Sequence, residues 1–411
     1  EIRKEVGDWL DLYWSPDRPL IEWRNILLQG GWASPSWPEE FYGRGYDSTQ
    51  TAVVNEVFLK KRAIGSAQVG PRRLAAETIL VHGSDDQKKR YLPPILTGEH
   101  AWCQLFSEPG SGSDLAGAST KAEFLDGRWV INGQKVWNTS AHHADFGILV
   151  ARTDWDLPKH QGLSYFLIDM HQAGIEVRPL KQMNGHASFN EVFITDAIVP
   201  AEDMMGSEGN GWAIATTTLS IERQGFARGR TPTAWGALTD GLIYKEYAKE
   251  LEIASEPYSW YPQREGRVDL ILDRSEDTGA IKNAAVRQEI AKLLCLSNGA
   301  RLAAASAVSH RSSGANQVIP AGSIGKLGAS VIARQSAHVH TMISGADAML
   351  SGPYSAEDGL IAETLVSVPA ISIAGGTDEI QRNIISERVL GMPKEKRSDT
   401  GPFRDIPRNV S

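Results

Sequence analysis

The spacing of apolar residues divides the chain into three parts, and the first of them has a helical period. Up to about residue 100, apolar positions recur every three to four residues with charges between them. We predict one helix that begins after Asp47 and runs through Leu59, and a second over 72–81. A third is expected from the cap at 83–87 to Pro93-Pro94, because prolines lack the N–H that a helix interior requires.

The second part, from about residue 101 to Pro200, consists of short alternating runs that are typical of strands. Asp126-Gly127 and Asn132-Gly133 are two-residue turn signals, so residues 118–138 are expected to hold strands joined by two sharp turns. Further strands are predicted over 146–151, 163–169 and 191–194. These short strands indicate a small β domain, a barrel or a sandwich.

In the third part, from Gly211 onward, the helical period returns. Val286, Ile290, Leu293 and Leu294 lie at offsets 0, 4, 7 and 8 and predict a stripe that faces a core. Residues 252–282 mix charges, aromatics and two prolines, and predict an excursion or loop. The chain is therefore expected to be a multidomain α+β protein with an N-terminal all-α domain (1–100), a middle β domain (101–205) and a C-terminal α domain (206–411).

Composition narrows the function classes only a little. The chain has 411 residues and a net charge of −8, which argues against nucleic acid as the main partner. No apolar run reaches the roughly 20 residues of a membrane span. Cys103 and Cys295 lie far apart without metal-ligand spacing, so we expect two buried thiols, no metal site and a reducing, cytoplasmic location.

Two segments of the β part carry candidate chemistry. Residues 107–114 read Ser-Glu-Pro-Gly-Ser-Gly-Ser-Asp, in which Gly110 and Gly112 allow close approach to a ligand and the serines supply donors. On the pattern alone, this could be any surface loop. Trp137 and Thr139 are two apart in a predicted strand and would share one face. A tryptophan in the core explains Trp137 equally well.

Two segments of the C-terminal part add to these. Glu222 lies in the stretch 219–223, Leu-Ser-Ile-Glu-Arg, among small and apolar residues of a predicted helix. A glutamate beside an arginine is more often simply solvated. The stretch 375–379, Gly-Gly-Thr-Asp-Glu, predicts a helix start that Thr377 caps. The first amides of such a helix also form an anion site.

Taken together, these segments resemble the acyl-CoA dehydrogenase family. The resemblance extends from Gly31-Trp32 to the stretch 384–391, which reads Ile-Ile-Ser-Glu-Arg-Val-Leu-Gly. It implies a flavoprotein of lipid β-oxidation that binds FAD and converts an acyl-CoA to the trans-2-enoyl-CoA. It further implies a C-terminal four-helix bundle, an electron-transfer flavoprotein as acceptor, and a homo- or hetero-oligomer built as a dimer of dimers.

The resemblance also assigns individual residues. It implies flavin contacts for Gln104, Phe106, Ser107, Gly112, Ser113, Trp137, Thr139, Thr377 and Glu379. It implies substrate contacts for Ser113, Ser220, Arg223, Gly375 and Gly376. In the family the tryptophan shields one flavin face and the threonine hydrogen-bonds near flavin N5. Arg223 is a substrate contact or a structural partner, and the structural role is slightly favoured.

One departure from the family pattern concerns the catalytic base. Many members carry it as a glutamate directly before the Gly-Thr pair, and here that position is Gly375. A minority branch, which includes long-chain and isovaleryl-type enzymes, places the base on another helix in a Leu-x-x-Glu-Arg setting. The stretch 219–223 reproduces that setting. The resemblance therefore implies that Glu222 removes the α-proton while hydride leaves the β-carbon for flavin N5.

Two further departures leave alternatives open. The family's Arg-x-x-Phe-Gly motif is missing around 244–264, and its Gln-x-x-Gly-Gly-x-Gly loop has only a distant counterpart at 344–353. Both motifs serve a neighbouring subunit's FAD. The chain thus resembles the catalytic, flavin-sharing partner in a heteromeric enzyme of the kind found in actinobacterial steroid degradation, or a homo-oligomer with altered FAD contacts. A non-catalytic subunit that completes a partner's flavin site is a second alternative, and an acyl-CoA oxidase is a third. The acyl group, whether long, branched or ring-bearing, is not specified.

Overall fold

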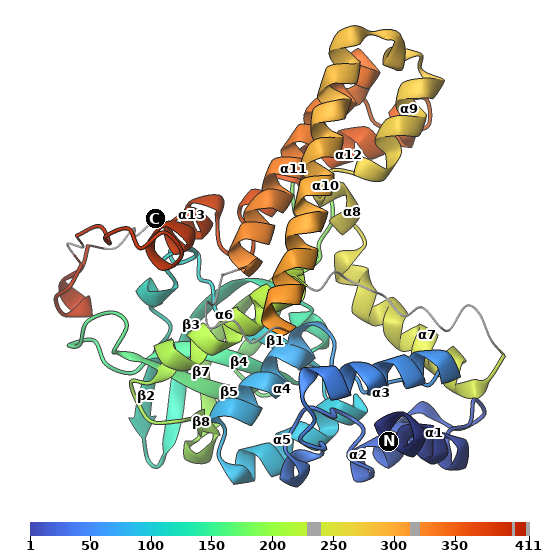
Figure 1. Cartoon of the computed structure of the whole chain (residues 1–411). Coiled ribbons are helices and arrows are strands. Elements are labelled where there is room, and N and C mark those ends of the chain that lie inside the picture. The colour runs from blue at the N-terminus through green and yellow to red at the C-terminus, as the bar shows by residue number, and fades with distance from the viewer. Residues whose placement is uncertain (228–239, 313–320, 397–398, 408–411) are drawn as a thin grey trace.

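A computed structural model describes residues 1–227, 240–312, 321–396 and 399–407. It shows a helical N-terminal part, a β-sheet, and long C-terminal helices that extend away from both (Figure 1). The N-terminal helices are α1 (Ile2–Tyr13), α2 (Leu20–Gln29), α3 (Ser48–Lys61), α4 (Gly70–His82) and α5 (Asp85–Thr97). Their core is rich in aromatic residues, with the Trp23 ring fully buried and Trp9 and Trp14 packed against it.

The three predicted N-terminal helices are confirmed, but the prediction that the third ends at Pro93-Pro94 is wrong. The Asp47 carboxylate caps α3 by accepting a 2.8 Å hydrogen bond from the Gln50 N–H. The Gln50 side chain in turn accepts a 2.9 Å hydrogen bond from the Asp47 N–H. Helix α5 continues through Pro93-Pro94 to Thr97 and is terminated by the C-cap Gly98, whose φ is 90°. The helix persists because the prolines remove only two N–H groups while tertiary burial holds the last turns. The buried residues there are Tyr91, Leu92, Ile95 and Leu96.

The middle part forms one eight-stranded sheet. Its strands are β1 (Trp102–Leu105), β2 (Lys121–Leu125), β3 (Arg128–Thr139), β4 (Phe146–Arg152), β5 (Leu163–Asp169), β6 (Ile175–Leu180), β7 (Phe189–Pro200) and β8 (Met204–Met205). Their order is β6-β7-β3-β2-β4-β5-β8, and β1 pairs with β4 in parallel. The predicted strands over 146–151, 163–169 and 191–194 are confirmed as β4, β5 and part of β7.

Of the two predicted turns, one is confirmed and one is wrong. Asp126-Gly127 joins β2 to β3 with φ angles of 49° and 79°, which suit a tight hairpin. Asn132-Gly133 instead lies inside β3, opposite a bulge in β7 where the register of the two strands shifts. The Asn132 side chain there exchanges two 2.9 Å hydrogen bonds with Asp196 of β7. A partner 64 residues away therefore overrides the local turn signal.

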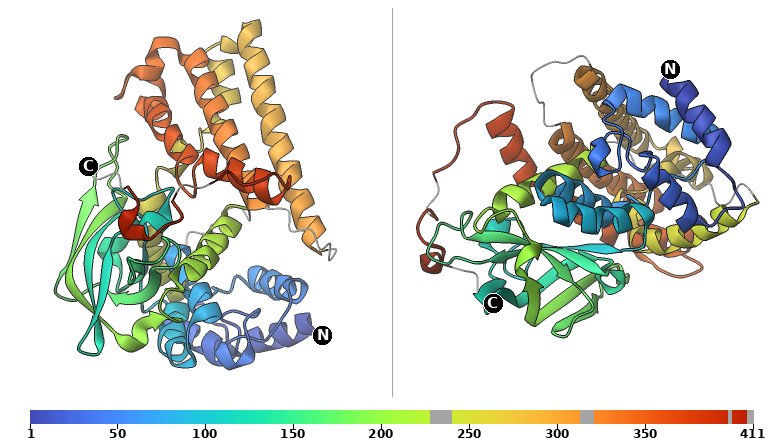
Figure 2. Two further views of the ribbon diagram at one scale, coloured as in Figure 1. Left: turned by 90° about the vertical axis from the view of Figure 1, so that its left-hand side faces the viewer. Right: turned by 90° about the horizontal axis from the view of Figure 1, so that it is seen from below.

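The C-terminal part is helical. It comprises α6 (Gly211–Ala227), α7 (Leu242–Ser255), α8 (Tyr261–Arg264), α9 (Ile271–Asp277), α10 (Ala284–Ser312), α11 (Ala321–Ser344), α12 (Leu360–Ser367) and α13 (Asp378–Arg388). Helix α11 contacts α9, α10 and α12, and α10 and α11 run side by side (Figures 1 and 2). The predicted loop over 252–282 is wrong in part because α8 and α9 interrupt it. Pro262 lies in the first turn of α8, where backbone N–H groups make no hydrogen bond within the helix. The N–H that proline lacks is therefore not needed there.

The apolar stripe on α10 is narrower than predicted. Val286, Ile290 and Leu293 are buried in a cluster with residues of α11, as expected. Leu294 is 37% exposed, so its inclusion in the stripe is wrong. Cys295 is also exposed, contrary to the prediction of two buried thiols, whereas Cys103 is buried in the sheet. Two residues beyond Leu293, Cys295 points about 200° around the helix and away from the core.

Helix α6 lies between the sheet and the helices α4 and α11, and this placement positions the candidate site. The buried Thr218 hydroxyl is 2.9 Å from the Thr78 hydroxyl of α4 and 3.0 Å from the Tyr165 hydroxyl of β5. These bonds fix the helix to both neighbours one turn before Glu222. Within the described ranges, no helix combines the length and apolar character that a bilayer crossing requires.

Candidate functional site

Glu222 lies on α6, the helix that packs against β4 and β5 of the sheet. It follows Thr218 by four residues and therefore lies on the same face of the helix. Burial raises the pKa of Glu222, and this shift is opposed by the charge of Arg223 and by a hydrogen bond from the Gln104 side chain. The structure thus brings Glu222 together with Gln104 of β1. A shielded carboxylate with a raised pKa is chemically suited to accept a proton.

The predicted flavin loop follows directly after β1. Phe106 is buried, with its ring at 5.9 Å from that of Tyr165, and the Ser107 carbonyl accepts a 2.9 Å bond from the Val136 N–H of β3. Beyond this anchored start the loop opens to the exterior. Gly112 and Ser113 are exposed, and a side chain built at Gly112 would meet nothing within 4 Å. The loop therefore has free space beside its backbone.

The start of this loop is held by an ion pair that the sequence analysis missed. The carboxylate of Glu108 accepts bonds from the Lys135 ammonium (2.8 Å), the Ser119 N–H (2.7 Å) and the Thr120 N–H (2.8 Å). Lys135 is fully buried and also donates to the carbonyls of Phe106 and Val150. Burial opposes ionisation of Glu108, but Lys135 and these hydrogen bonds bring its pKa down to about 2.

Trp137 lies on β3 at a second bulge. Its φ is 63°, and the register with β7 shifts between Lys135 and Asn138. The side chain is 55% exposed, so the interpretation of Trp137 as a core tryptophan is wrong. The bulge also interrupts the strict alternation from which a shared face for Trp137 and Thr139 was predicted. The indole instead makes an edge contact with Phe189, at 5.8 Å between ring centroids.

Asn138 joins Trp137 and Thr139 to the residues around Glu222. Its side-chain amide donates to the Gln104 carbonyl at 2.8 Å, which ties β3 to β1. Its Oδ1 atom is buried without a hydrogen-bond partner. Thr139 is partly buried and lies opposite Phe189 in the ladder. The arrangement places an exposed indole, a hydroxyl and an unpaired carbonyl oxygen in consecutive residues. The sequence analysis missed Asn138.

The glycine turn before α13 has the geometry of a capped helix start. Gly375 and Gly376 have φ angles of 68° and 85°, and the Gln381 side chain donates to both carbonyls at 3.0 and 3.2 Å. The Thr377 hydroxyl accepts from the Ile380 N–H at 3.3 Å, which confirms the predicted cap. The exposed Glu379 points away from the core and pairs with Arg382 at 3.6 Å.

Arg223 follows Glu222 on α6, and charges from both α6 and α13 act on it. Burial lowers the pKa of Arg223, Glu222 opposes the shift, and Arg388 of α13 adds to it. The neighbouring Ser220 is exposed. Among the described residues, no hydrogen bond or ion pair joins the 375–379 turn to Glu222. The predicted residues therefore form one group around Glu222, Gln104 and Asn138, and a second group at the glycine turn.

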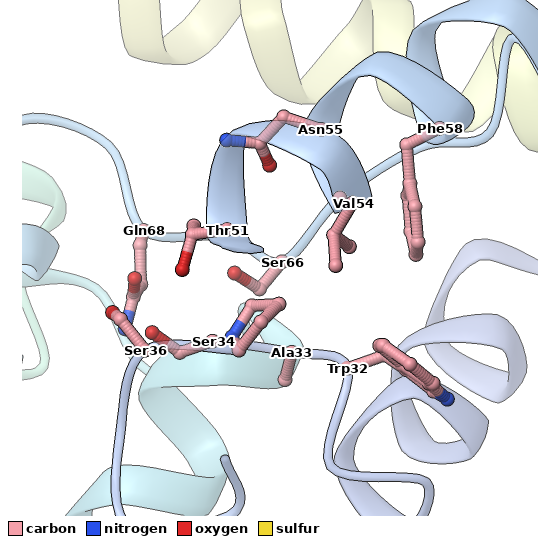
Figure 3. A pocket seen from close by; sticks show the side chains of 12 residues that line it. Trp32, Ala33, Ser34, Ser36, Thr51, Val54, Asn55, Phe58, Ser66 and Gln68 are labelled. Carbon is pink, nitrogen blue, oxygen red and sulfur yellow. The ribbon is translucent and has the colours of Figure 1, made fainter. Parts of the chain in front are cut away.

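A polar pocket lies apart from both groups, between α3 and the loops that precede and follow this helix (Figure 3). Hydroxyl and amide side chains form much of its lining, namely Ser34, Ser36, Thr51, Asn55, Ser66 and Gln68. Figure 3 shows that the Thr51 and Ser66 hydroxyls point into it. None of the predicted flavin or substrate residues belongs to its lining, so we do not place the chemistry there.

Comparison with known proteins gives a consistent result along the chain. Profiles described as acyl-CoA dehydrogenase N-terminal, middle and C-terminal domains match residues 4–99, 103–197 and 267–390. The acyl-CoA dehydrogenase IpdE1 of Mycobacterium tuberculosis is 32% identical over 379 residues, covering 91% of this chain and 88% of that protein. The chain belongs to the acyl-CoA dehydrogenase family. The predicted three-part fold is confirmed.

Two further similarities extend the comparison. The acyl-CoA dehydrogenase FadE34 of M. tuberculosis is 36% identical over 373 residues, covering 90% of this chain but 46% of its own length. The chain thus spans about half of that relative. A solved structure described as the Tcur3481-Tcur3483 steroid ACAD superposes with a TM-score of 0.65, 22% identity and coverage of 96% and 97%. At this identity the likeness concerns the fold.

Acyl-CoA dehydrogenases are FAD-dependent oxidoreductases, and the residues described above fit a flavin. The exposed indole of Trp137 offers an aromatic plane, and the loop at Gly112 has open space beside its backbone. The buried Oδ1 of Asn138 is a hydrogen-bond acceptor that has no donor among the described residues. FAD is therefore the cofactor of this chain by its family, and these residues provide a chemically suitable set of contacts.

Proposed function

We propose that this acyl-CoA dehydrogenase uses Glu222 to remove the α-proton of an acyl-CoA thioester. The observation that carries the proposal is the position of Glu222, partly buried on α6 and next to Gln104 of β1, the strand that leads into the flavin loop; burial there raises the pKa of Glu222. Gly375 has no side chain to serve as base at the position most members use. A base that is shielded from bulk water at this place explains why the chain can dispense with a glutamate at Gly375.

The chain's own residues divide the remaining work. When bound, FAD supplies the oxidant that takes a hydride from the β-carbon. Trp137 would cover one face of the flavin ring, and Thr139 and the 107–113 loop would hydrogen-bond its edge. The N–H groups of the 375–376 turn are suited to hold the thioester oxygen, which stabilises the charge that develops when Glu222 takes the proton.

The proposal includes the assembly and the electron acceptor. We propose an oligomer, a dimer of dimers, that passes electrons to an electron-transfer flavoprotein. A second candidate is a flavin-sharing subunit of a heteromeric enzyme. It is favoured by the two missing FAD motifs and by the fold likeness to a steroid ACAD that is named for two components. A steroid-derived or other bulky acyl-CoA is the substrate class we would test first.

Replacing the base tests the proposal. The Glu222→Gln variant keeps the shape and the hydrogen bond to Gln104 but removes the proton acceptor, and its kcat should fall by ~10²–10⁴-fold. Glu208→Gln is the matched control, since Glu208 is an exposed carboxylate just before α6. Enoyl-CoA formation is measured with an acyl-CoA panel, with the chain alone and with co-expressed candidate partner subunits. Glu222→Gln activity within a few-fold of the parent would exclude Glu222 as base.

A further inference from the structure

The C-terminal tail leaves α13 and returns to the sheet, next to the loop that follows β4 (Figure 2). The N–H groups of Phe403 and Arg404 donate to the carbonyls of Leu157 and Trp155, both at 3.0 Å. Pro402 forms a β-bridge with Pro158 in the same loop. The Phe403 ring is 1% exposed. Backbone bonds and a buried aromatic ring therefore dock the tail on the middle domain.

The docked ring covers a buried arginine that braces the end of the candidate flavin loop. The Arg152 guanidinium lies 3.4 Å from the centroid of the Phe403 ring, within range of a cation–π contact. Arg152 is itself fully buried and donates to the carbonyls of Ala116 (2.7 Å) and Ala118 (3.0 Å). These two residues come directly after the 107–114 loop. Phe403 thus shields from water the group that fixes the chain there.

A lysine makes a second connection between the tail and the loop. The buried Lys159 ammonium lies 2.7 Å from both carboxylate oxygens of Asp114, the last residue of the loop. The same ammonium forms an ion pair with Asp399 of the tail. Because the Lys159 side chain is only 4% exposed, one buried charge joins two carboxylates from segments 285 residues apart in sequence (399 minus 114).

We propose that residues 399–406 act as a strap that positions the 107–114 loop for the flavin, with Phe403 and Lys159 as positioning residues. The inference rests on the proposed function in assigning this loop to the flavin. Within the loop, the buried Ser111 hydroxyl donates to the Asp114 carbonyl at 2.6 Å, and its backbone bridges to Glu108, whereas Gly112 and Ser113 are exposed. The start of the loop is fixed by the Glu108–Lys135 pair, and its end is fixed through Lys159 and the Arg152 that the tail covers.

The test compares Phe403→Ala with Phe403→Tyr, which keeps the aromatic face, and with Arg404→Ala as a matched control. Arg404 is the next residue of the strap, and its side chain pairs with Asp156 in an exposed position. Hydrogen exchange of peptides over 107–118 and FAD affinity of the apoprotein are measured. Phe403→Ala should speed exchange in 107–118 and raise the Kd for FAD by about three- to tenfold. Phe403→Tyr should restore both values, and Arg404→Ala should change neither.

Two outcomes overturn the strap: Phe403→Ala with parental exchange and parental FAD affinity, or equal effects of Phe403→Ala and Arg404→Ala. If Phe403→Ala fails to fold, Asp399→Asn, which removes one of the two carboxylates at Lys159, replaces it with a smaller expected change in the same direction. If the parent binds no FAD either alone or with a co-expressed partner subunit, the assignment of the loop to the flavin fails. Hydrogen exchange of peptides over 107–118 then tests the strap without the FAD measurement. Faster exchange in Phe403→Ala than in the parent supports the strap, and unchanged exchange overturns it.

Discussion

The buried ion pair between Glu108 and Lys135 makes a quantitative prediction about the stability of the middle domain. In the Lys135→Met variant the side chain keeps much of its length but loses its charge. Glu108 would then remain buried with its backbone hydrogen bonds but without its 2.8 Å partner. The carbonyls of Phe106 and Val150 would lose their bonds to the ammonium as well.

The magnitude follows from the burial of both groups. Lys135 has no exposed side-chain area and Glu108 only 6%. Removing one partner of a buried pair typically costs about 3–5 kcal/mol, because the remaining charge is left uncompensated. The pKa of Glu108 agrees in direction. Although burial opposes ionisation, Lys135 and the hydrogen bonds from Thr120 and Ser119 lower this pKa to about 2, so the folded protein favours the ionised carboxylate.

The sign of the pH dependence separates this mechanism from a simple packing defect. Since the folded pKa of Glu108 lies below its usual value, its contribution is complete above about pH 5 and is lost as the pH falls toward 2. In Lys135→Met burial is no longer opposed by the ammonium, so the pKa of Glu108 rises. The variant should therefore regain stability relative to the parent on mild acidification, as the unpaired carboxylate is protonated.

Urea unfolding followed by circular dichroism and tryptophan fluorescence checks these values between pH 4 and pH 8. Lys121→Met is the control, because Lys121 on β2 forms an exposed 2.6 Å pair with Glu123. Its loss should cost about 0–1 kcal/mol at every pH. The reasoning would be refuted by a Lys135→Met loss as small as that of Lys121→Met. A loss that does not shrink on acidification would assign the effect to packing alone.

Two more predictions concern pH. The charge of Arg223 lowers the pKa of Glu222, so Arg223→Gln should move the acidic limb of the kcat/KM profile to higher pH. Arg223→Lys keeps the charge and should leave the limb near its position in the parent. An acidic limb that does not move in Arg223→Gln excludes this coupling. Burial lowers the pKa of His340 to about 4, so folding stability should be complete above about pH 6.5 and fall toward pH 4. His340→Gln should flatten the change in Tm between pH 7.5 and 5 relative to the parent, and an unchanged slope contradicts the assignment.

Local patterns in the sequence predict much of this fold, because they determine local structure. The capping residues before α3 and the Asp126-Gly127 turn act through neighbours in the chain, and both predictions are confirmed. The wrong predictions concern segments whose conformation is set by contacts with residues distant in the sequence. Asn132-Gly133 has the same local signal as Asp126-Gly127, yet the bonds to Asp196 hold it inside β3, opposite a bulge in β7. Helix α5 continues past its two prolines because its last turns are buried.

The candidate site shows the same division. The pairing of Glu222 with Gly375 is visible in the sequence because both lie in motifs, although their catalytic roles stay predictions. The residues that support the loop lie outside every motif. Lys135 continues the odd-numbered inward positions of Trp129 and Ile131, a signal that could have marked it as a buried charge. No local pattern marks Lys159, because its two carboxylate partners come from remote segments.

The backbone of the glycine turn agrees with the relocation of the base. Gly375 has a φ of 68°, in the left-handed region where a residue with a Cβ costs roughly 1–2 kcal/mol. A glutamate at this position would have to bear that strain or change the turn, which the two bonds from Gln381 hold in place. A glutamate on α6 avoids this conflict, because the helical backbone accommodates it without strain. The positive φ at Gly375 is thus consistent with the proposal that Glu222, and not a residue at 375, serves as the base.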